Sequence, residues 1–86
     1  MQIFTTFLAA VLFAAAPAFA DDLQDATQLL KAGQPQQALE RVNRALAAKP
    51  REPQARFLKG LILTEQGNTK DAIDIFTRLT QDYPDL

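Results

Sequence analysis

Residues 53–86 read PQARFLKGLILTEQGNTKDAIDIFTRLTQDYPDL, and this stretch decides the fold. Moved back by 34 residues, it falls on the preceding part of the chain with its glycine, alanine and proline in matching places. The matched pairs are Gly67 with Gly33, Ala72 with Ala38, Pro84 with Pro50, Leu63 with Leu29, Ile73 with Leu39, Phe76 with Val42, and Gly60 with Ala26. A 34-residue period with a small residue in each helix and a proline at its end predicts two copies of a helical hairpin.

Apolar residues at helical spacing predict four helices, and no segment shows the alternation of a β-strand. Gly33 and Gly67 follow the first and third predicted helices, where a left-handed residue commonly ends a helix. Asp21 and Asp22 are the predicted N-caps of the first helix, and Pro35 suits the first turn of the second. The predicted helices cover about residues 21–32, 35–48, 53–66 and 69–82.

Charged pairs are predicted on the outer faces of two of these helices. Glu40 with Arg44 and Asp74 with Arg78 stand at i, i+4, the spacing at which side chains of one helix meet. Each such pair stabilises a helix by only about 0.2–0.5 kcal/mol.

Residues 1–20 carry no charged side chain, and the run from residue 3 to residue 16 is almost wholly apolar. Such a run followed by small-x-small is typical of a secretory signal peptide, so we predict cleavage after Ala20 and a periplasmic or secreted product, residues 21–86. A membrane span would need about 20 strongly apolar residues, and Pro17 interrupts this shorter stretch. No Lys or Arg precedes the run, which leaves an uncleaved anchor or a start codon placed too late as alternatives.

The composition argues against an enzyme and against a nucleic-acid-binding protein. Nine Lys and Arg against ten Asp and Glu give a net charge of −1, so there is no broad basic field. With no Cys and no His, the chain has no disulfide, no thiolate zinc site and no histidine general base. We therefore expect no catalytic site, no cofactor, no metal and no small-molecule substrate, with membrane association only through the export signal.

Two groups of acidic residues have simple structural interpretations. Asp21, Asp22 and Asp25 lack the glycine and the alternating oxygen ligands of a calcium loop, and helix capping explains them. Asp71 and Asp74 share a helical face, but nothing near them in the sequence would desolvate a carboxylate. We interpret them as a solvated face rather than as an acid/base pair.

The repeated hairpin resembles the tetratricopeptide repeat family, with repeats at about 19–52 and 53–86 across the whole mature chain. That family has small residues at repeat positions 8, 20 and 27, bulky apolar residues at 4, 7, 11 and 24, and proline at 32. The matching residues are Ala26, Leu29, Ala38, Val42, Ala45 and Pro50, then Gly60, Leu63, Ala72, Phe76 and Pro84. The departures are Asp22 and Arg56 at position 4, Asp25 and Lys59 at position 7, and Leu79 at position 27.

The resemblance implies an all-α solenoid of two helix-turn-helix repeats, preceded by a signal peptide helix, that binds a protein or peptide. In the family, the first helix of each repeat lines the concave face, which here gives Leu23, Thr27, Leu30, Lys31, Gln54, Phe57, Leu61, Thr64 and Glu65. Members that clamp a terminal carboxylate carry Lys and Asn at positions 5 and 9. Apolar residues and a threonine stand there in this chain, so we expect an apolar groove with a polar edge instead. The alternative is that Phe57 and Leu61 only pack against a neighbouring helix.

This resemblance implies a non-catalytic scaffold module of the bacterial periplasm or cell envelope. A second hypothesis is the positioning arm of a larger exported enzyme whose catalytic domain lies beyond Leu86. A third is a self-assembling element that pairs through the edge near Phe76, Leu79 and Tyr83. A solenoid of two repeats without a capping helix is short, so a fragment of a longer protein and pairing with another copy are both open.

Overall fold

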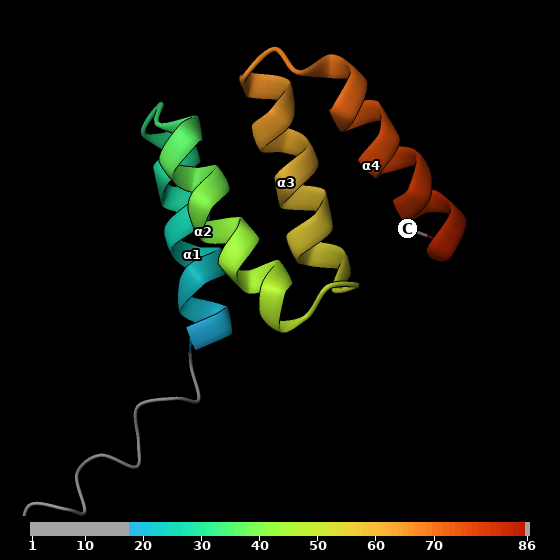
Figure 1. Ribbon diagram of the computed structural model, residues 1–86, viewed down its shortest axis with the longest axis horizontal. Coiled ribbons are helices and arrows are strands. Elements are labelled where there is room, and N and C mark those ends of the chain that lie inside the picture. Colours follow the sequence, from blue (N-terminus) through green and yellow to red (C-terminus); the bar gives the residue numbers. More distant parts are fainter. Residues whose placement is uncertain (1–17, 86) are drawn as a thin grey trace, which may run out of the picture.

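The computed structural model describes residues 18–85, and all the regular structure in this range is helical (Figure 1). This confirms the predicted all-α fold class. Residues 1–17 of the predicted signal peptide lie outside the described residues. The helices are α1 (Ala18–Lys31), α2 (Pro35–Ala48), α3 (Pro53–Glu65) and α4 (Thr69–Asp82).

The helices form two hairpins, α1 with α2 and α3 with α4, placed side by side (Figure 1). The hairpins meet through α2 and α3, and α3 also makes a slight contact with α1. Among the described helices, α4 packs only on α3. The far side of α4 is therefore not covered by any other described helix.

The turn inside each hairpin has the same geometry. Gly33 and Gly67 have φ values of 77° and 79°, as predicted for residues that end a helix in the left-handed conformation. The amide of Gln34 donates to the carbonyl of Leu29 at 2.9 Å, and that of Asn68 donates to Leu63 at 2.8 Å. Both turns are therefore Schellman motifs, in which a helix ends by satisfying its own last carbonyls.

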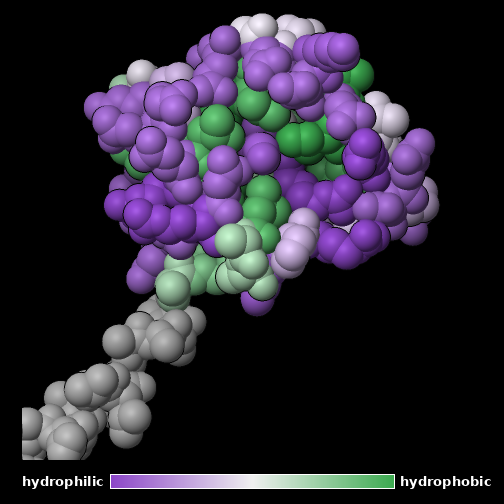
Figure 2. Space-filling model, viewed as in Figure 1, coloured by the Kyte–Doolittle hydropathy of each residue, from purple (hydrophilic) through white to green (hydrophobic). Residues whose placement is uncertain are grey.

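The core lies where α1, α2 and α3 meet. Its fully buried residues are Ala26, Ala38, Val42, Ala55 and Ile62. Partly buried leucines from the same three helices and Phe19 pack around this cluster. Three of the five buried residues are alanines, and two of them, Ala26 and Ala38, stand at the positions where small residues were predicted. Over the face that Figure 2 shows, hydrophilic side chains cover most of the surface and hydrophobic ones lie in the hollows between helices.

In the second hairpin, a glycine makes room for an aromatic ring. Gly60 of α3 is buried, and a Cβ placed on it would lie 2.4 Å from two ring carbons of Phe76 on α4. The Phe76 ring in turn lies 5.7 Å from the ring of Phe57, tilted by 54°. Gly60 and Phe76 are the counterparts of Ala26 and Val42 in the first hairpin. The equivalent space between the two helices is therefore filled by alanine and valine in the first hairpin, and by glycine and phenylalanine in the second.

Helix α1 already includes Ala18, the first residue that the structure describes, so it contains three residues that precede the predicted helix. The predicted N-caps Asp21 and Asp22 are therefore wrong, since both lie inside the helix. Phe19 supports this part of the helix, because it packs against the core and its ring lies 4.6 Å from the Nζ atom of Lys49. The N-cap of α3 is Glu52, whose Oε1 accepts from the amides of Gln54 and Ala55 at 2.9 and 3.2 Å.

We expect Phe19→Ala to lower the free energy of unfolding by about 1–2 kcal/mol. Full burial of a phenylalanine contributes about 1.5–3 kcal/mol and Phe19 is only partly buried, while the ammonium contact adds about 0.5–1 kcal/mol. Urea denaturation followed by circular dichroism measures the loss. Lys49→Ala is the control that removes the cation alone, with a loss below about 1 kcal/mol. Equal stability of Phe19→Ala and the parent would show that the first turn of α1 contributes nothing.

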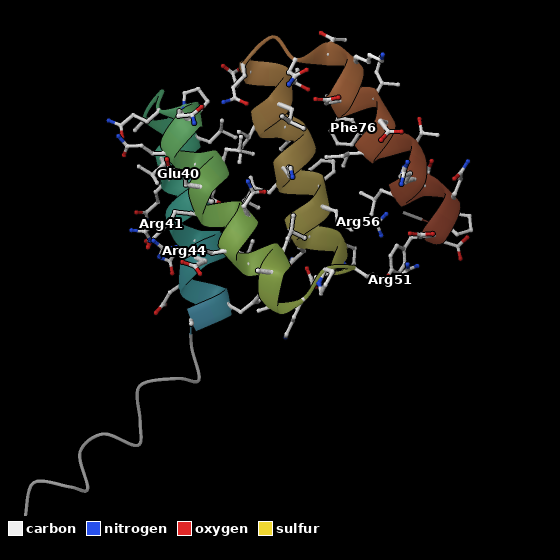
Figure 3. The ribbon with its side chains drawn as sticks, viewed as in Figure 1. Glu40, Arg41, Arg44, Arg51, Arg56 and Phe76 are labelled. Carbon is white, nitrogen blue, oxygen red and sulfur yellow. The ribbon has the colours of Figure 1, made fainter. Side chains whose placement is uncertain are left out.

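The charged residues at repeat position 4, Asp22 and Arg56, are paired within their own hairpins. Figure 3 labels the arginines of these pairs. Asp22 of α1 lies 3.8 Å from both Arg41 and Arg44 of α2, with only 15% of its side chain exposed. In the second hairpin the signs are reversed, because Arg56 of α3 lies 2.8 Å from Asp82. That contact has the geometry of an ion pair rather than of an aligned hydrogen bond, since the Nη1 atom of Arg56 has no hydrogen-bond partner.

One of the two predicted helical pairs is present. Arg78 lies 3.4 Å from Asp74, which confirms that pair. The predicted pair of Glu40 with Arg44 is wrong, because Arg44 faces Asp22 on the neighbouring helix instead. The physical reason is that the largely buried Asp22 carboxylate requires a nearby cation, whereas Glu40 is exposed and solvated.

Candidate functional site

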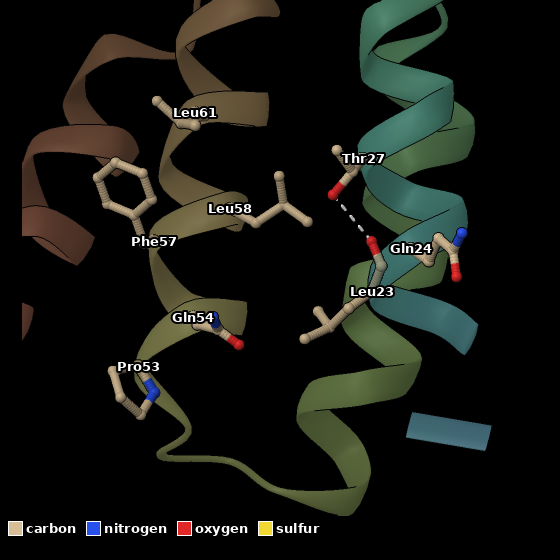
Figure 4. Close-up of a pocket in the computed structure, with 8 residues that line it drawn as sticks. All are labelled: Leu23, Gln24, Thr27, Pro53, Gln54, Phe57, Leu58 and Leu61. Carbon is tan, nitrogen blue, oxygen red and sulfur yellow. Dashed lines mark hydrogen bonds between the residues drawn. The ribbon is translucent and has the colours of Figure 1, made fainter. Parts of the chain in front are cut away.

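A groove of about 720 Å³ lies between α1 and α3 (Figure 4). Its lining contains no charged side chain. The lining residues are Leu23, Gln24, Thr27, Pro53, Gln54, Phe57, Leu58 and Leu61.

The repeat places equivalent residues of the two hairpins in this groove. Leu23 and Phe57 are separated by one 34-residue period, and so are Thr27 and Leu61. Within each helix the two residues stand four apart, a spacing that puts them on one face. These four residues stand at positions 5 and 9 of the 34-residue repeat, where family members that clamp a terminal carboxylate carry Lys and Asn.

Five of the nine residues predicted to bind a partner line the groove: Leu23, Thr27, Gln54, Phe57 and Leu61. The other four do not line it, because the groove ends at Thr27 on α1 and at Leu61 on α3, before the last turn of each helix. Leu30 packs against the core, Lys31 ends α1, and Thr64 and Glu65 lie exposed at the end of α3. The sequence reasoning missed Gln24, Pro53 and Leu58. Of these, only Leu58 carried a signal, because it belongs to the apolar run that follows Phe57.

Two large side chains of the lining are open to solvent. Phe57 is 50% exposed and Leu61 is 39% exposed. The ring of Phe57 packs on Phe76 of α4, so this contact holds it in place without covering it. The groove therefore presents apolar surface on a rigid helix, which is the arrangement that partner-binding aromatic residues use.

The polar groups of the lining are few, and one of them is already satisfied. The Thr27 hydroxyl donates to the carbonyl of Leu23 at 2.9 Å (Figure 4). The carboxamides of Gln24 and Gln54 remain, and each can both donate and accept a hydrogen bond. The lining can thus bind an apolar segment and its amide groups, but it offers no charge to an ionic ligand.

Several of the charged residues outside the groove have structural partners. A smaller hollow of about 430 Å³ beside α1 and α2 includes Asp25 and Arg41, which form an ion pair with each other. Residues 18–85 hold no group of three or more His, Cys, Asp or Glu side chains that could bind a metal ion. None of the four described helices has both the length and the apolar character that a membrane crossing requires.

The fold and the groove define a class: a protein of repeated helical hairpins whose first helices form a shared surface. The chain belongs to the tetratricopeptide repeat family, whose model matches residues 23–86. Neither the comparison with curated proteins nor the comparison with solved structures gave a match. Repeats of this family generally mediate contacts between proteins.

Proposed function

We propose that this protein is a non-catalytic scaffold module of the bacterial periplasm or cell envelope, and that the groove between α1 and α3 binds a partner polypeptide. The observation that carries the proposal is the exposure of Phe57 and Leu61 in a groove without charged side chains. Membership of the family supports a protein partner.

The energetics of the groove favour a partner with apolar side chains. Covering apolar surface stabilises a complex by about 25 cal/mol per Å², reduced by the entropy lost on association. Because Phe57 and Leu61 lie on a preformed helix, little of that gain is lost in ordering the binding surface. A charged ligand would lose its hydration here without gaining a partner charge.

The proposed location rests on the sequence of residues 1–20, which has the pattern of a secretory signal. Cleavage after Ala20 would remove the first turn of α1 together with Phe19. Cleavage would therefore act before Phe19 packs on the core, while the chain is still being exported.

Capture of partners by the mature chain tests the proposal. A Phe57→Ala, Leu61→Ala double variant is compared with the parent as bait in periplasmic extract, and each captured protein is then purified and titrated. We expect at least a tenfold weaker Kd for the double variant, since each truncation of an interface hot spot costs about 2 kcal/mol. Ile73→Ala is the matched control, because Ile73 is 59% exposed but lies outside the groove. If no captured protein depends on the groove residues, the proposal is wrong.

A second candidate function, self-assembly, is favoured by the outer side of α4. Of the predicted pairing edge, Leu79 is buried and Tyr83 is 37% exposed. Within residues 18–85, Ile73 is the most exposed of the large hydrophobic residues, and among the described helices α4 packs only on α3. Sedimentation of the chain across micromolar concentrations measures its state of association directly. Association that Ile73→Asp abolishes would establish self-assembly, and a monomer at all concentrations would exclude it.

A further inference from the structure

We propose that Phe76 of α4, which lies outside the groove, positions the Phe57 ring for binding, so that docking of α4 on α3 controls the affinity of the groove. The inference rests on the proposed function, because the groove is the same binding surface. It adds a form of regulation. The groove binds its partner more tightly while α4 is docked, and a bound partner in return stabilises the docked α4.

Helix α4 lies outside the core of the molecule. The core cluster and the residues packed around it come from α1, α2 and α3. Among the described helices α4 packs only on α3, whereas each of the other three packs on at least two helices. Within α4 only Ala72 and Leu79 are buried. An element with so few buried apolar contacts opens at a lower free energy than the core does, so α4 can detach while the other helices stay folded.

The docked α4 supports the wall of the groove at its middle. Figure 4 shows the Phe57 ring on the side of α3 that faces α4, and its centroid lies 5.7 Å from that of the Phe76 ring. A Cβ on Gly60 would lie 2.4 Å from carbons of the Phe76 ring, so this ring lies against the backbone of α3. Because Phe57 is half exposed, detachment of α4 removes a neighbour that restrains its ring.

The end of α4 is also tied to the part of the chain where the groove begins. Asp82 lies 2.8 Å from Arg56 and 3.4 Å from Arg51. These two arginines flank Pro53 and Gln54, which belong to the groove lining. Detachment of α4 therefore releases the wall of the groove at its beginning as well as in its middle.

The size of the coupling follows from the cost of ordering the wall. Immobilising one side chain on binding costs about two- to twelvefold in affinity. With the Phe57 ring and the beginning of the wall both held by α4, we expect about tenfold tighter binding to the docked form. Linkage requires that a bound ligand shift the docking equilibrium by the same factor.

Hydrogen exchange of backbone amides in the mature chain, residues 21–86, tests whether α4 detaches separately. We expect α4 amides to exchange at least tenfold faster than α2 amides, relative to their intrinsic rates, because α2 opens only when the whole chain unfolds. Ile62→Val weakens the packing of α3 on the first hairpin without touching the contacts of α4. It should speed α2 exchange about fivefold and leave α4 exchange unchanged.

The coupling is measured with Nile red, an uncharged apolar probe suited to a lining without charged side chains. Its fluorescence gives Kd, and the Phe57→Ala, Leu61→Ala double variant shows whether it binds in the groove. At about ten times Kd, α2 exchange should slow about tenfold, because the probe does not bind the unfolded chain. Exchange of α4 should slow about fivefold, because the detached form binds the probe about tenfold more weakly.

Phe76→Ala removes the ring contact without changing a groove residue, and it should reduce the slowing of α4 exchange to about twofold or less. Leu79→Ala is the matched control, because it removes another side chain by which α4 is docked. In this variant both helices exchange faster without the probe, but the probe should still slow α4 about fivefold. Equal slowing of α4 exchange in the two variants would overturn the role of Phe76.

An α4 rate that the probe leaves unchanged, beside slowed α2 amides, would show equal binding to the docked and detached forms. That result would overturn the inference and leave the proposed function intact. Exchange of α4 and α2 at equal rates that rise together in Ile62→Val would also overturn the inference, because α4 would then not detach separately. A probe that does not bind, or that binds the double variant equally well, would contradict the apolar groove and overturn the proposed function itself.

Discussion

Ile62→Ala is expected to lower the free energy of unfolding by about 3 kcal/mol. Ile62 is fully buried where α3 meets the first hairpin, so its truncation removes transfer free energy and leaves a cavity. A domain of this size has a total stability of roughly 3–10 kcal/mol, so the loss is a large part of it. Urea denaturation measures the change, and at the lower end of that range the variant is partly unfolded at 37 °C.

Ile73→Ala is the matched control for this experiment, because it makes the same truncation at a residue that is 59% exposed. We expect its effect to lie within about 0.5 kcal/mol, as is usual for surface positions. Equal losses for the two variants would contradict the packing of α3 on the first hairpin and would mean that Ile73 is covered in solution.

The second large effect is expected at the pair formed by Gly60 and Phe76. Gly60→Ala alone should lower the free energy of unfolding by about 1–2 kcal/mol, although alanine favours a helix over glycine by about 1 kcal/mol. The new methyl group would overlap the Phe76 ring and push it out of its contact with Phe57. Phe76→Val alone should cost a similar amount, because it leaves the space beside Gly60 empty.

Together the two substitutions should cost less than either single one. Gly60→Ala with Phe76→Val reproduces the Ala26 and Val42 pair of the first hairpin, where both residues are fully buried. We expect a coupling energy of about 1–2 kcal/mol in a double-mutant cycle, within the range of residues in contact. Additivity to within about 0.5 kcal/mol would show that the methyl group and the ring do not compete for the same space.

Much of the fold was predictable because local signals agree along this chain. The apolar stripes, the prolines and the two turn glycines indicate the same boundaries, and α2 has its predicted bounds. The helical conformation of Phe19 was not predictable, because this residue packs against the core and contacts Lys49, which is distant in the sequence. Glu52 was missed for a different reason, since glutamate is not among the side chains usually found at an N-cap.

The pairing of charges shows the limit of reasoning from spacing. The pair of Asp74 with Arg78 follows from the helix alone, since both residues are exposed on one helical face. The same spacing fails for Glu40 and Arg44, because the choice of partner depends on a third residue from another helix. That residue, Asp22, is largely buried and attracts both Arg41 and Arg44.

By itself, the sequence determined the helices, the repeat and the residue types at positions 5 and 9, because these depend on the local backbone and on a fixed period. Only the tertiary structure decided where the groove begins and ends, and that Phe57 stays half exposed while it packs on Phe76. The physical reason is that the exposure of a side chain depends on the distance and angle between helices. Those are set by the side chains where the helices meet, such as Gly60 beneath the Phe76 ring, and no spacing along one helix encodes them.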